Sequence, residues 1–217
     1  RGIGKTTTMK FGKVAKAILF REKKHIVYVS NTLDIAEMST EHIKRELLNN
    51  EMVLKVFGDI SKKIDTDSSV KEQFGRTAWV AFGNTLVVPR GCGQQIRGMN
   101  YEVRPDLIIC DDPENRKEIK NEVIRAENRR WMLGDLVPAL DQYKKDGEII
   151  YVDTLKHHDA LPLHLAQKSD WDYKSYSLCD TETLESFVPA YMSTEEIKAT
   201  YNEYELSGDL DIFYQEY

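Results

Sequence analysis

Short apolar runs separated by polar, helix-forming stretches dominate most of the chain. Four runs rich in Val, Ile and Leu predict buried strands, at residues 25–30, 85–89, 106–112 and 148–154. Stretches of helix-forming composition predict helices, at residues 5–22, 32–50 and 115–133. This alternation is typical of βαβ units. It predicts an α/β fold with a mainly parallel sheet covered by helices on both faces.

Two further regions do not follow this alternation. Residues 58–73 are polar and charged, which predicts a surface loop with weak helical character. Residues 180–217 have a helical pattern and carry ten acidic residues against one lysine, a local charge of −9 that leaves +3 for residues 1–179 out of the total of −6. We therefore predict an α/β core at 1–179 and an acidic, mostly helical subdomain or linker at 180–217.

Composition narrows the class of protein. Hydrophobic residues make up 41% of the chain and aromatic residues 10%, which suits a packed globule. No apolar run reaches the roughly 18 residues that a membrane span needs, and the three cysteines form no C-x-x-C pair. These features predict a cytoplasmic protein without a membrane partner. The uneven charge leaves DNA open as a partner.

The chain opens RGIGKTTT, which matches the second half of the phosphate-binding pattern G-x-x-x-x-G-K-[ST]. Because Gly4 takes the place of the second glycine, we expect the first strand and the start of the loop to be missing before Arg1. Lys5 would neutralise the β- and γ-phosphates, and the Thr6 hydroxyl would hold Mg²⁺. The predicted nucleotide-binding residues are Gly2, Gly4, Lys5, Thr6 and Thr7. The alternative is an ordinary polar helix start, with the threonines as capping residues.

The strand predicted at 106–112 ends in two acids. ATPases with a phosphate loop need a strand-end carboxylate to hold Mg²⁺, which Asp111 would supply beside Thr6. A second carboxylate can orient and deprotonate the attacking water, and Asp112 and Glu114 are both candidates. The same acids would also suit the N-terminus of a helix that begins at Pro113.

A glycine-rich turn, GCGQQIRG at residues 91–98, places Arg97 shortly before this strand. An arginine on such a turn could reach a γ-phosphate across a subunit boundary and stabilise the charge of the transition state. A surface arginine without a function is the more ordinary alternative.

The stretch GCGQQIRGMNYEVRPDLIICDDPENRKE, together with the opening RGIGKT, closely resembles the ATPase centre of the large terminase subunits of tailed bacteriophages. The segment YVDTLKHHDAL is similar to the coupling motif of that family, and the segment from Phe187 onward resembles its passage out of the ATPase domain. The resemblance spans nearly the whole chain. It implies a P-loop NTPase of the additional-strand catalytic-glutamate type, a motor that hydrolyses ATP with Mg²⁺ to translocate double-stranded DNA into a procapsid.

The resemblance also implies roles for single residues. Asp111 would be the Walker B aspartate that holds Mg²⁺ with Thr6. Arg1 would match the arginine inside the family's loop, Arg97 the arginine that acts on a neighbouring subunit, and Thr154 the coupling residue that senses loss of the γ-phosphate. The implied partners are double-stranded DNA, a ring of its own subunits on the portal protein, and the small terminase subunit. The implied location is the cytoplasm of an infected or lysogenic bacterial host.

Two features depart from the family pattern. Asp112 stands where the family usually has glutamate, so either the shorter acid positions the water differently or Glu114 takes the role. The upstream segment that would contact adenine is absent from the sequence.

The nuclease domain that forms the second half of such proteins has no counterpart here, so we expect the intact protein, and not this chain, to cut DNA.

Two other functions stay open on the sequence alone. A helicase or repair-type DNA-dependent ATPase would need further helicase motifs and usually a second motor-like domain, which the sequence does not show. A non-hydrolysing nucleotide- or DNA-binding scaffold is favoured by one feature, the aspartate at position 112.

Overall fold

The computed structural model describes residues 4–62, 75–96, 103–141 and 146–217. Contacts divide the chain into two units, one formed by Lys5–Asp153 and the other by Arg1–Gly4 together with Thr154–Tyr217. The sequence predicted a boundary after residue 179, whereas the structure groups residues 154–179 with the C-terminal residues.

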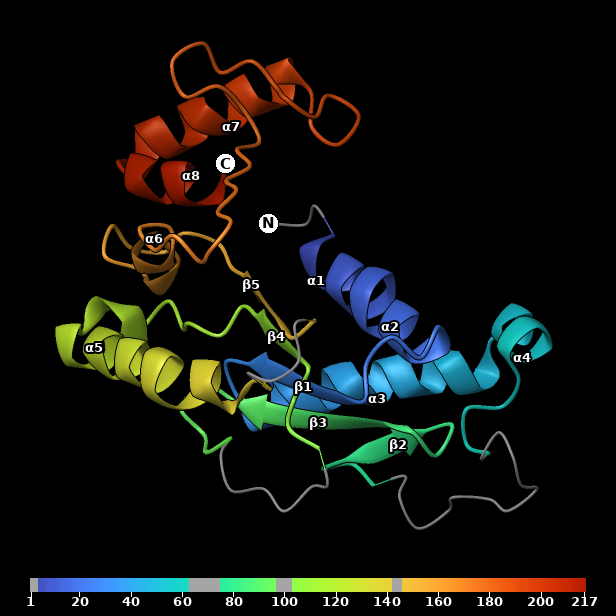
Figure 1. The fold of residues 1–217 in the computed structure, drawn as a ribbon. Coiled ribbons are helices and arrows are strands. Elements are labelled where there is room, and N and C mark those ends of the chain that lie inside the picture. Colours follow the sequence, from blue (N-terminus) through green and yellow to red (C-terminus); the bar gives the residue numbers. More distant parts are fainter. Residues whose placement is uncertain (1–3, 63–74, 97–102, 142–145) are drawn as a thin grey trace. The chain divides into compact units, whose positions relative to one another are not determined.

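The first unit is built on a five-stranded sheet in the order β2-β3-β1-β4-β5 (Figure 1). The strands are β1 (His25–Ser30), β2 (Trp79–Ala81), β3 (Thr85–Gly91), β4 (Leu107–Asp111) and β5 (Glu148–Val152). All pairs are parallel except β2 with β3. The predicted α/β fold with a mainly parallel sheet is therefore confirmed. The three-residue strand β2 was not predicted, because so short a run carries no readable alternation.

The start of β4 is tied to the start of β1 by a buried carboxylate. Asp106 Oδ1 accepts a hydrogen bond of 2.9 Å from the backbone N–H of His25, and its Oδ2 accepts one of 2.9 Å from the N–H of Lys24. The register of the two strands follows, with Tyr28 opposite Ile109. Because side chains alternate along a strand, this register decides which residues share a face of the sheet.

One face of the sheet is covered by helices from the N-terminal third of the chain. A continuous helical segment comprises α1 (Lys5–Thr7), η1 (Thr8–Ala15), which is wound as a π-helix, and α2 (Lys16–Leu19); α3 (Leu33–Asn49) lies beside it. Their apolar side chains form one core cluster with inward-facing strand residues; among its members are Val14, Ile18, Ile43, Ile26, Tyr28 and Ile109. The predicted helices at 5–22 and 32–50 are thus confirmed with shorter bounds.

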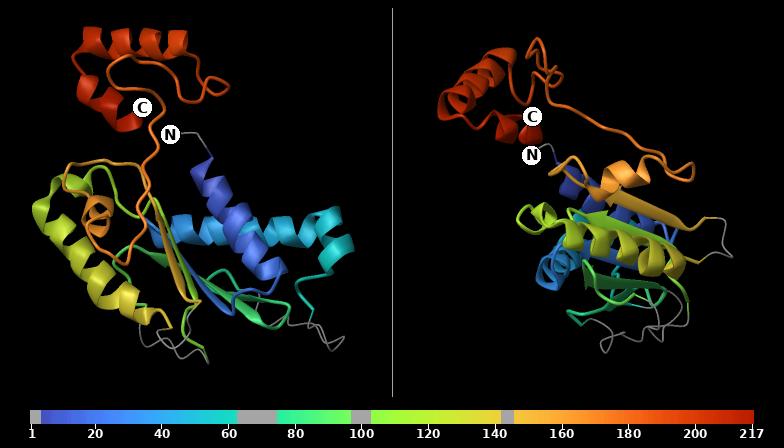
Figure 2. Two further views of the ribbon diagram at one scale, coloured as in Figure 1. Left: turned by 45° about the horizontal axis from the view of Figure 1, so that its top comes forward. Right: turned by 90° about the vertical axis from the view of Figure 1, so that its left-hand side faces the viewer.

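The opposite face carries the helices that follow β4 (Figure 2). They are η3 (Glu118–Lys120), α5 (Glu122–Trp131), η4 (Met132–Leu136) and η5 (Val137–Ala139). Trp131 Nε1 donates a hydrogen bond of 2.8 Å to the carbonyl of Gln94, which fixes the end of α5 to the turn after β3. The single helix predicted at 115–133 is in fact several short segments, because Asn121 leaves the helical conformation with ψ at 120° and caps a new start.

A further helix, α4 (Glu51–Phe57), was not predicted. Asn50 ends α3 in an extended conformation, and its side chain accepts hydrogen bonds from the N–H groups of Met52 and Val53. One asparagine therefore ends one helix and caps the next. Most of the loop predicted at 58–73 lies outside the described residues.

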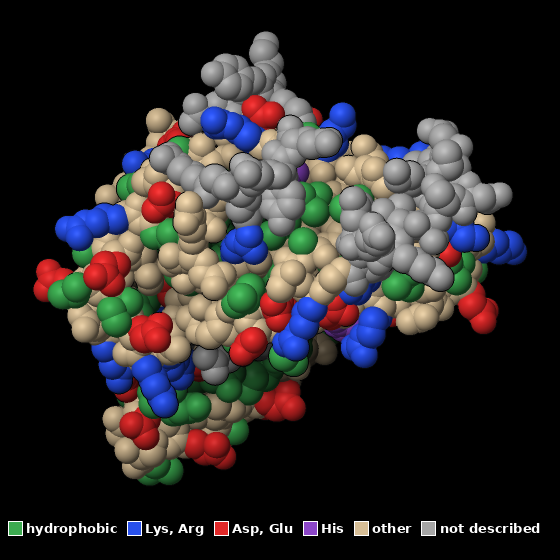
Figure 3. Space-filling model, turned by 90° about the horizontal axis from the view of Figure 1, so that it is seen from below, with side chains coloured by type: hydrophobic (Ala, Val, Ile, Leu, Met, Phe, Trp, Pro, Cys, Tyr) green, Lys and Arg blue, Asp and Glu red, His purple; other side chains and the backbone are tan. Residues whose placement is uncertain are grey.

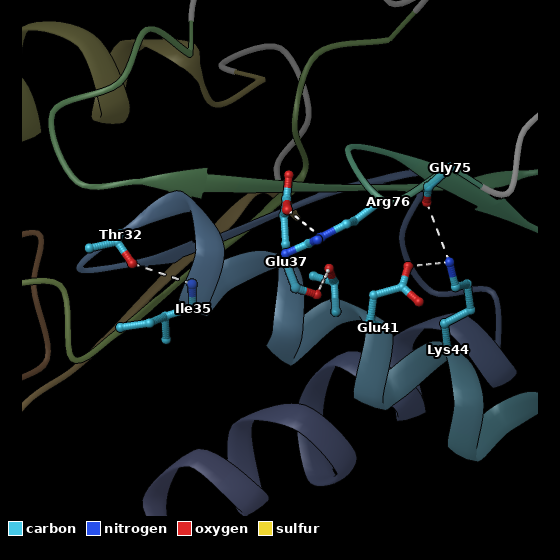
Figure 4. Close-up of polar contacts among 8 residues, drawn as sticks. Thr32, Ile35, Glu37, Glu41, Lys44, Gly75 and Arg76 are labelled. Carbon is cyan, nitrogen blue, oxygen red and sulfur yellow. Dashed lines mark hydrogen bonds and ion pairs between the residues drawn. The ribbon is translucent and has the colours of Figure 1, made fainter.

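Two polar contacts join α3 to the segment before β2 (Figure 4). Glu37 pairs with Arg76 at 2.6 Å, and the side chain of Glu37 is only 8% exposed. Lys44 pairs with Glu41, and its Nζ also donates to the carbonyl of Gly75 at 3.4 Å. These contacts place residues 75 and 76 along α3.

The C-terminal unit contains α6 (Leu161–Leu165), α7 (Thr194–Ser207) and α8 (Leu210–Glu216). Ser193 and Glu196 form a capping box at the start of α7. A small core joins α7 and α8 to the segment before them; its buried members are Leu178, Cys179, Ile197 and Phe213. The predicted helical character of the residues beyond 179 is confirmed for α7 and α8.

Charges of both signs are interspersed over the face of the molecule seen in Figure 3, where Lys and Arg side chains alternate with Asp and Glu among the described residues. Within the same described residues, every helix is too short or too polar to cross a lipid bilayer.

Candidate phosphate and metal site

The first helix begins directly after Gly4. Gly4 has φ at +79°, in the left-handed region, and Lys5 already belongs to α1. A side chain at position 4 would meet no atom within 4 Å, so glycine is favoured there by backbone conformation and not by space. Because the helix starts at Lys5 and Thr7 makes no side-chain capping bond, the threonines are helical residues and not caps.

The side chains of Thr6 and Asp111 meet at one end of the sheet. Thr6 Oγ1 donates a hydrogen bond of 3.1 Å to Asp111 Oδ1. Asp111 is the last residue of β4 and is 5% exposed. Thr6 is half-buried in the first turn of the helix, and Thr7 beside it is exposed. The structure therefore brings together the two residues that the sequence predicted as metal ligands.

Two residues that the sequence did not indicate also interact with this carboxylate, Tyr28 by a hydrogen bond and Lys10 through its charge. Tyr28 of β1 donates a hydrogen bond of 2.7 Å to Asp111 Oδ2. Burial, with the charge of Asp111, raises the pKa of Tyr28 well above its usual value. Burial lowers the pKa of Lys10, which the nearby Asp111 carboxylate partly offsets. Only the position of Tyr28 among the aliphatic residues Ile26, Val27 and Val29 could have signalled its role.

Asp112 turns the chain sharply after β4. Its φ is +48°, a left-handed conformation that aspartate tolerates better than most residues. Its backbone N–H donates to the carbonyl of Val152 at 2.9 Å, which joins the turn to the end of β5. Its side chain is half-buried, and its charge contributes to the raised pKa of Tyr28.

Glu114 belongs to a different group of side chains. It is 4% exposed. Burial raises the pKa of Cys92 to about 12 and raises the pKa of Tyr151 well above its usual value, and Glu114 is among the negative groups that add to both shifts. Tyr151 lies opposite Cys110 in the sheet register, and Cys110 points away from Asp111 because neighbours in a strand face opposite sides. The structure thus places Asp111 and Asp112 near Tyr28, and Glu114 near Tyr151.

The donor atoms at Asp111 suit Mg²⁺. A threonine hydroxyl and a carboxylate are hard oxygen ligands, which this ion prefers, and Mg²⁺ usually takes one or two protein ligands together with water and phosphate oxygens. Within the described ranges, no group of three or more His, Cys, Asp and Glu side chains is arranged to hold a metal ion. The residues present therefore fit a metal that arrives with a phosphate ligand.

Four other predicted site residues lie outside the described part of the first unit. Arg1, Gly2 and Arg97 lie outside the described residues. Thr154 is half-buried and belongs to the C-terminal unit. The structure therefore leaves the predicted roles of these residues as predictions.

The sequence was compared with protein-family models and with curated proteins. Neither a protein-family model nor a curated protein matches the sequence. The resemblance to large terminase subunits rests on the residues and motifs of the chain itself.

Proposed function

We propose that this chain is the ATPase domain of a DNA-packaging motor of the terminase type, a P-loop NTPase that hydrolyses ATP to move double-stranded DNA into a procapsid. The observation that carries the proposal is the contact of Thr6 with Asp111. A strand-end carboxylate beside the hydroxyl of a phosphate loop is the arrangement that holds Mg²⁺ in such enzymes.

The start of the helix would bind the phosphates. Backbone N–H groups after Gly4 and the positive end of the helix dipole favour an anion there. Lys5 would neutralise the β- and γ-phosphates, with Gly2 and Thr7 adding contacts beside it. Bound Mg²⁺, held by Thr6 and Asp111, would supply further neutralisation of the phosphate charge.

A carboxylate must orient the water that attacks the γ-phosphorus. In that step the water oxygen bonds to phosphorus, the bond to the β-phosphate oxygen breaks and ADP leaves, and the carboxylate accepts the water proton. Of the two candidates we propose Asp112. The charge of Asp112 helps to raise the pKa of Tyr28, which contacts Asp111. The charge of Glu114 instead helps to raise the pKa values of Cys92 and Tyr151.

The remaining roles come from the resemblance to the family. Arg1 would lie close to the phosphates, Arg97 would complete the site of a neighbouring subunit, and Thr154 would couple loss of the γ-phosphate to movement of DNA. The motor would work as a ring on the portal protein with the small terminase subunit, in the cytoplasm of an infected or lysogenic bacterium. The intact protein would also cut DNA through a further domain. On the face in Figure 3 the charges of the described residues are of both signs and interspersed, and the DNA partner is proposed from the resemblance.

Nucleotide binding by the full-length protein tests the proposal. We expect a fluorescent ATP analogue with Mg²⁺ to bind the unchanged protein, and Lys5→Ala to weaken binding by about tenfold or more. Lys16→Ala is the matched control, because Lys16 lies on the same helical segment but is exposed and pairs with Glu22. Absence of binding, or equal binding by both variants, would contradict the proposal.

A further inference from the structure

The two oxygens of the Asp111 carboxylate have different partners. Oδ1 accepts from the Thr6 hydroxyl at 3.1 Å. Oδ2 accepts from the Tyr28 hydroxyl at 2.7 Å, and this contact is buried. A hydroxyl bound to a carboxylate at this distance forms a charge-assisted hydrogen bond, which is among the stronger kinds in proteins. The hydrogen bond from Tyr28 is therefore the contact that fixes the orientation of the Asp111 carboxylate.

Tyr28 is held rigidly enough to set that orientation. Its side chain is 0% exposed and belongs to the core cluster that includes Val14 and Ile109. Its hydroxyl also takes part in a hydrogen bond with Ser39, a buried residue of α3. The phenol is thus fixed by the ring packing and by a contact with a second element, while its proton is directed at Asp111.

We propose that Tyr28 is a positioning residue for Mg²⁺. Its hydroxyl occupies Oδ2 of Asp111, so that only Oδ1 is presented to the metal beside Thr6. The proposal rests on the proposed nucleotide site. Partners that hold a metal ligand in place are worth 10–100-fold in metal affinity or activity. Tyr28 would not touch the nucleotide, so its loss should act on the metal and leave metal-free nucleotide binding unchanged.

The chain offers a matched control in Tyr151. It is also a tyrosine of the sheet with a buried hydroxyl, but it lies on the face opposite Asp111. Tyr28→Phe and Tyr151→Phe each remove one buried hydroxyl and keep the ring. Any general effect of losing such a hydroxyl should appear in both variants, whereas an effect on the metal should appear only in Tyr28→Phe.

The test measures Mn²⁺ binding by electron paramagnetic resonance, with ADP present, on the full-length protein. We expect Tyr28→Phe to weaken Mn²⁺ binding by about 10–100-fold, with ADP affinity in EDTA unchanged and Tyr151→Phe equal to the unchanged protein. In the Asp111→Asn background, Tyr28→Phe should have no further effect. Mn²⁺ affinity in Tyr28→Phe equal to that of the unchanged protein would overturn the positioning role alone.

Two further outcomes are decisive. If the unchanged protein binds no Mn²⁺ with ADP, the proposed nucleotide site and the role of Tyr28 both fall. If thermal unfolding shows that Tyr28→Phe does not fold, Ser39→Ala replaces it, because it loosens the Tyr28 hydroxyl without changing the ring. We then expect Mn²⁺ binding weaker by about two- to tenfold, and an unchanged affinity would overturn the role.

Discussion

The hydroxyl of Thr6 and the carboxylate of Asp111 lie 3.1 Å apart, although 105 positions of sequence separate them. The fold makes this contact, because Thr6 lies in the first turn of the helical segment that begins at Lys5, and β4 ends at Asp111. Carboxyl ends of parallel strands and the helix starts beside them meet at one edge, where ligands of open α/β sheets bind. Thr6 and Asp111 therefore lie where ligands of such sheets bind.

The two acids that follow Asp111 should differ sharply in their effect on catalysis. We expect Asp112→Asn to lower kcat for ATP hydrolysis by about 10²–10⁴-fold, because the water would lose its general base. We expect Glu114→Gln to leave kcat nearly unchanged, since Glu114 lies with Cys92 and Tyr151. Steady-state phosphate release measures both, and nucleotide binding checks that each variant still has an intact site. A normal kcat in Asp112→Asn with a large loss in Glu114→Gln would reverse the assignment.

Cys92 provides an independent measure of where Glu114 lies. Burial first, and then the charges of Glu114 and Glu118, raise the pKa of Cys92 to about 12. A raised thiol pKa keeps the neutral form dominant below that pH, and only the thiolate reacts. At pH 8 the thiolate fraction is then roughly 10⁻⁴, about 10³-fold below that of a free thiol.

Labelling with a thiol-specific disulfide reagent at pH 8 should therefore be slow at Cys92 until the protein is unfolded in urea. Glu114→Gln should speed the labelling, because one of the charges that raise the pKa is removed. Asp112→Asn is the control and should leave the rate unchanged. Equal rates in Glu114→Gln and the unchanged protein would place Glu114 away from Cys92.

The fold was largely predictable from the sequence, and the reason is visible in its strands. The runs at β1, β3, β4 and β5 are apolar over most of their length, so strands could be recognised there without long-range information. In β1 and β4 every residue is buried, as expected for central strands covered on both faces. The three-residue strand β2 and the helix α4 were missed. The first has too few residues for a pattern, and the second is separated from α3 only by the cap at Asn50.

The candidate site was predictable only where a motif marks it. Thr6 and Asp111 belong to patterns of fixed spacing, so their contact could be expected. Tyr28 could not be found in this way, because its role depends on the register of β1 with β4, which the sequence does not encode locally. Lys10 was missed for a similar reason, since its approach to Asp111 depends on how the first helical segment packs on the sheet.

The ion pair between Glu37 and Arg76 should make a modest contribution to stability. Arg76 has a side chain that is 63% exposed, so solvent screens the 2.6 Å contact, although Glu37 is almost buried. We expect Arg76→Ala to lower the free energy of unfolding by about 1 kcal/mol, and by less at high salt. Urea denaturation measures the change. Lys16→Ala, which breaks an exposed pair, is the control and should have a smaller effect; a larger one would contradict this ranking.

A trans role for Arg97 predicts complementation between inactive variants. Arg97→Ala protein would keep an intact phosphate site but lack the group that completes its neighbour's site, whereas Lys5→Ala protein would keep Arg97. Mixing the two should restore part of the ATPase activity that neither shows alone. If no mixing ratio gives activity above the sum of the separate proteins, Arg97 does not act across a subunit boundary.

The most direct test of the central claim is phosphate release from ATP by the full-length protein, with Asp111→Asn as the isosteric comparison. The account predicts Mg²⁺-dependent hydrolysis that linear double-stranded DNA stimulates, and a loss of about 10³-fold or more in Asp111→Asn. Hydrolysis that persists undiminished in Asp111→Asn would contradict the assigned metal site. Nucleotide binding without any hydrolysis, with or without DNA, would contradict the motor and favour a non-hydrolysing scaffold.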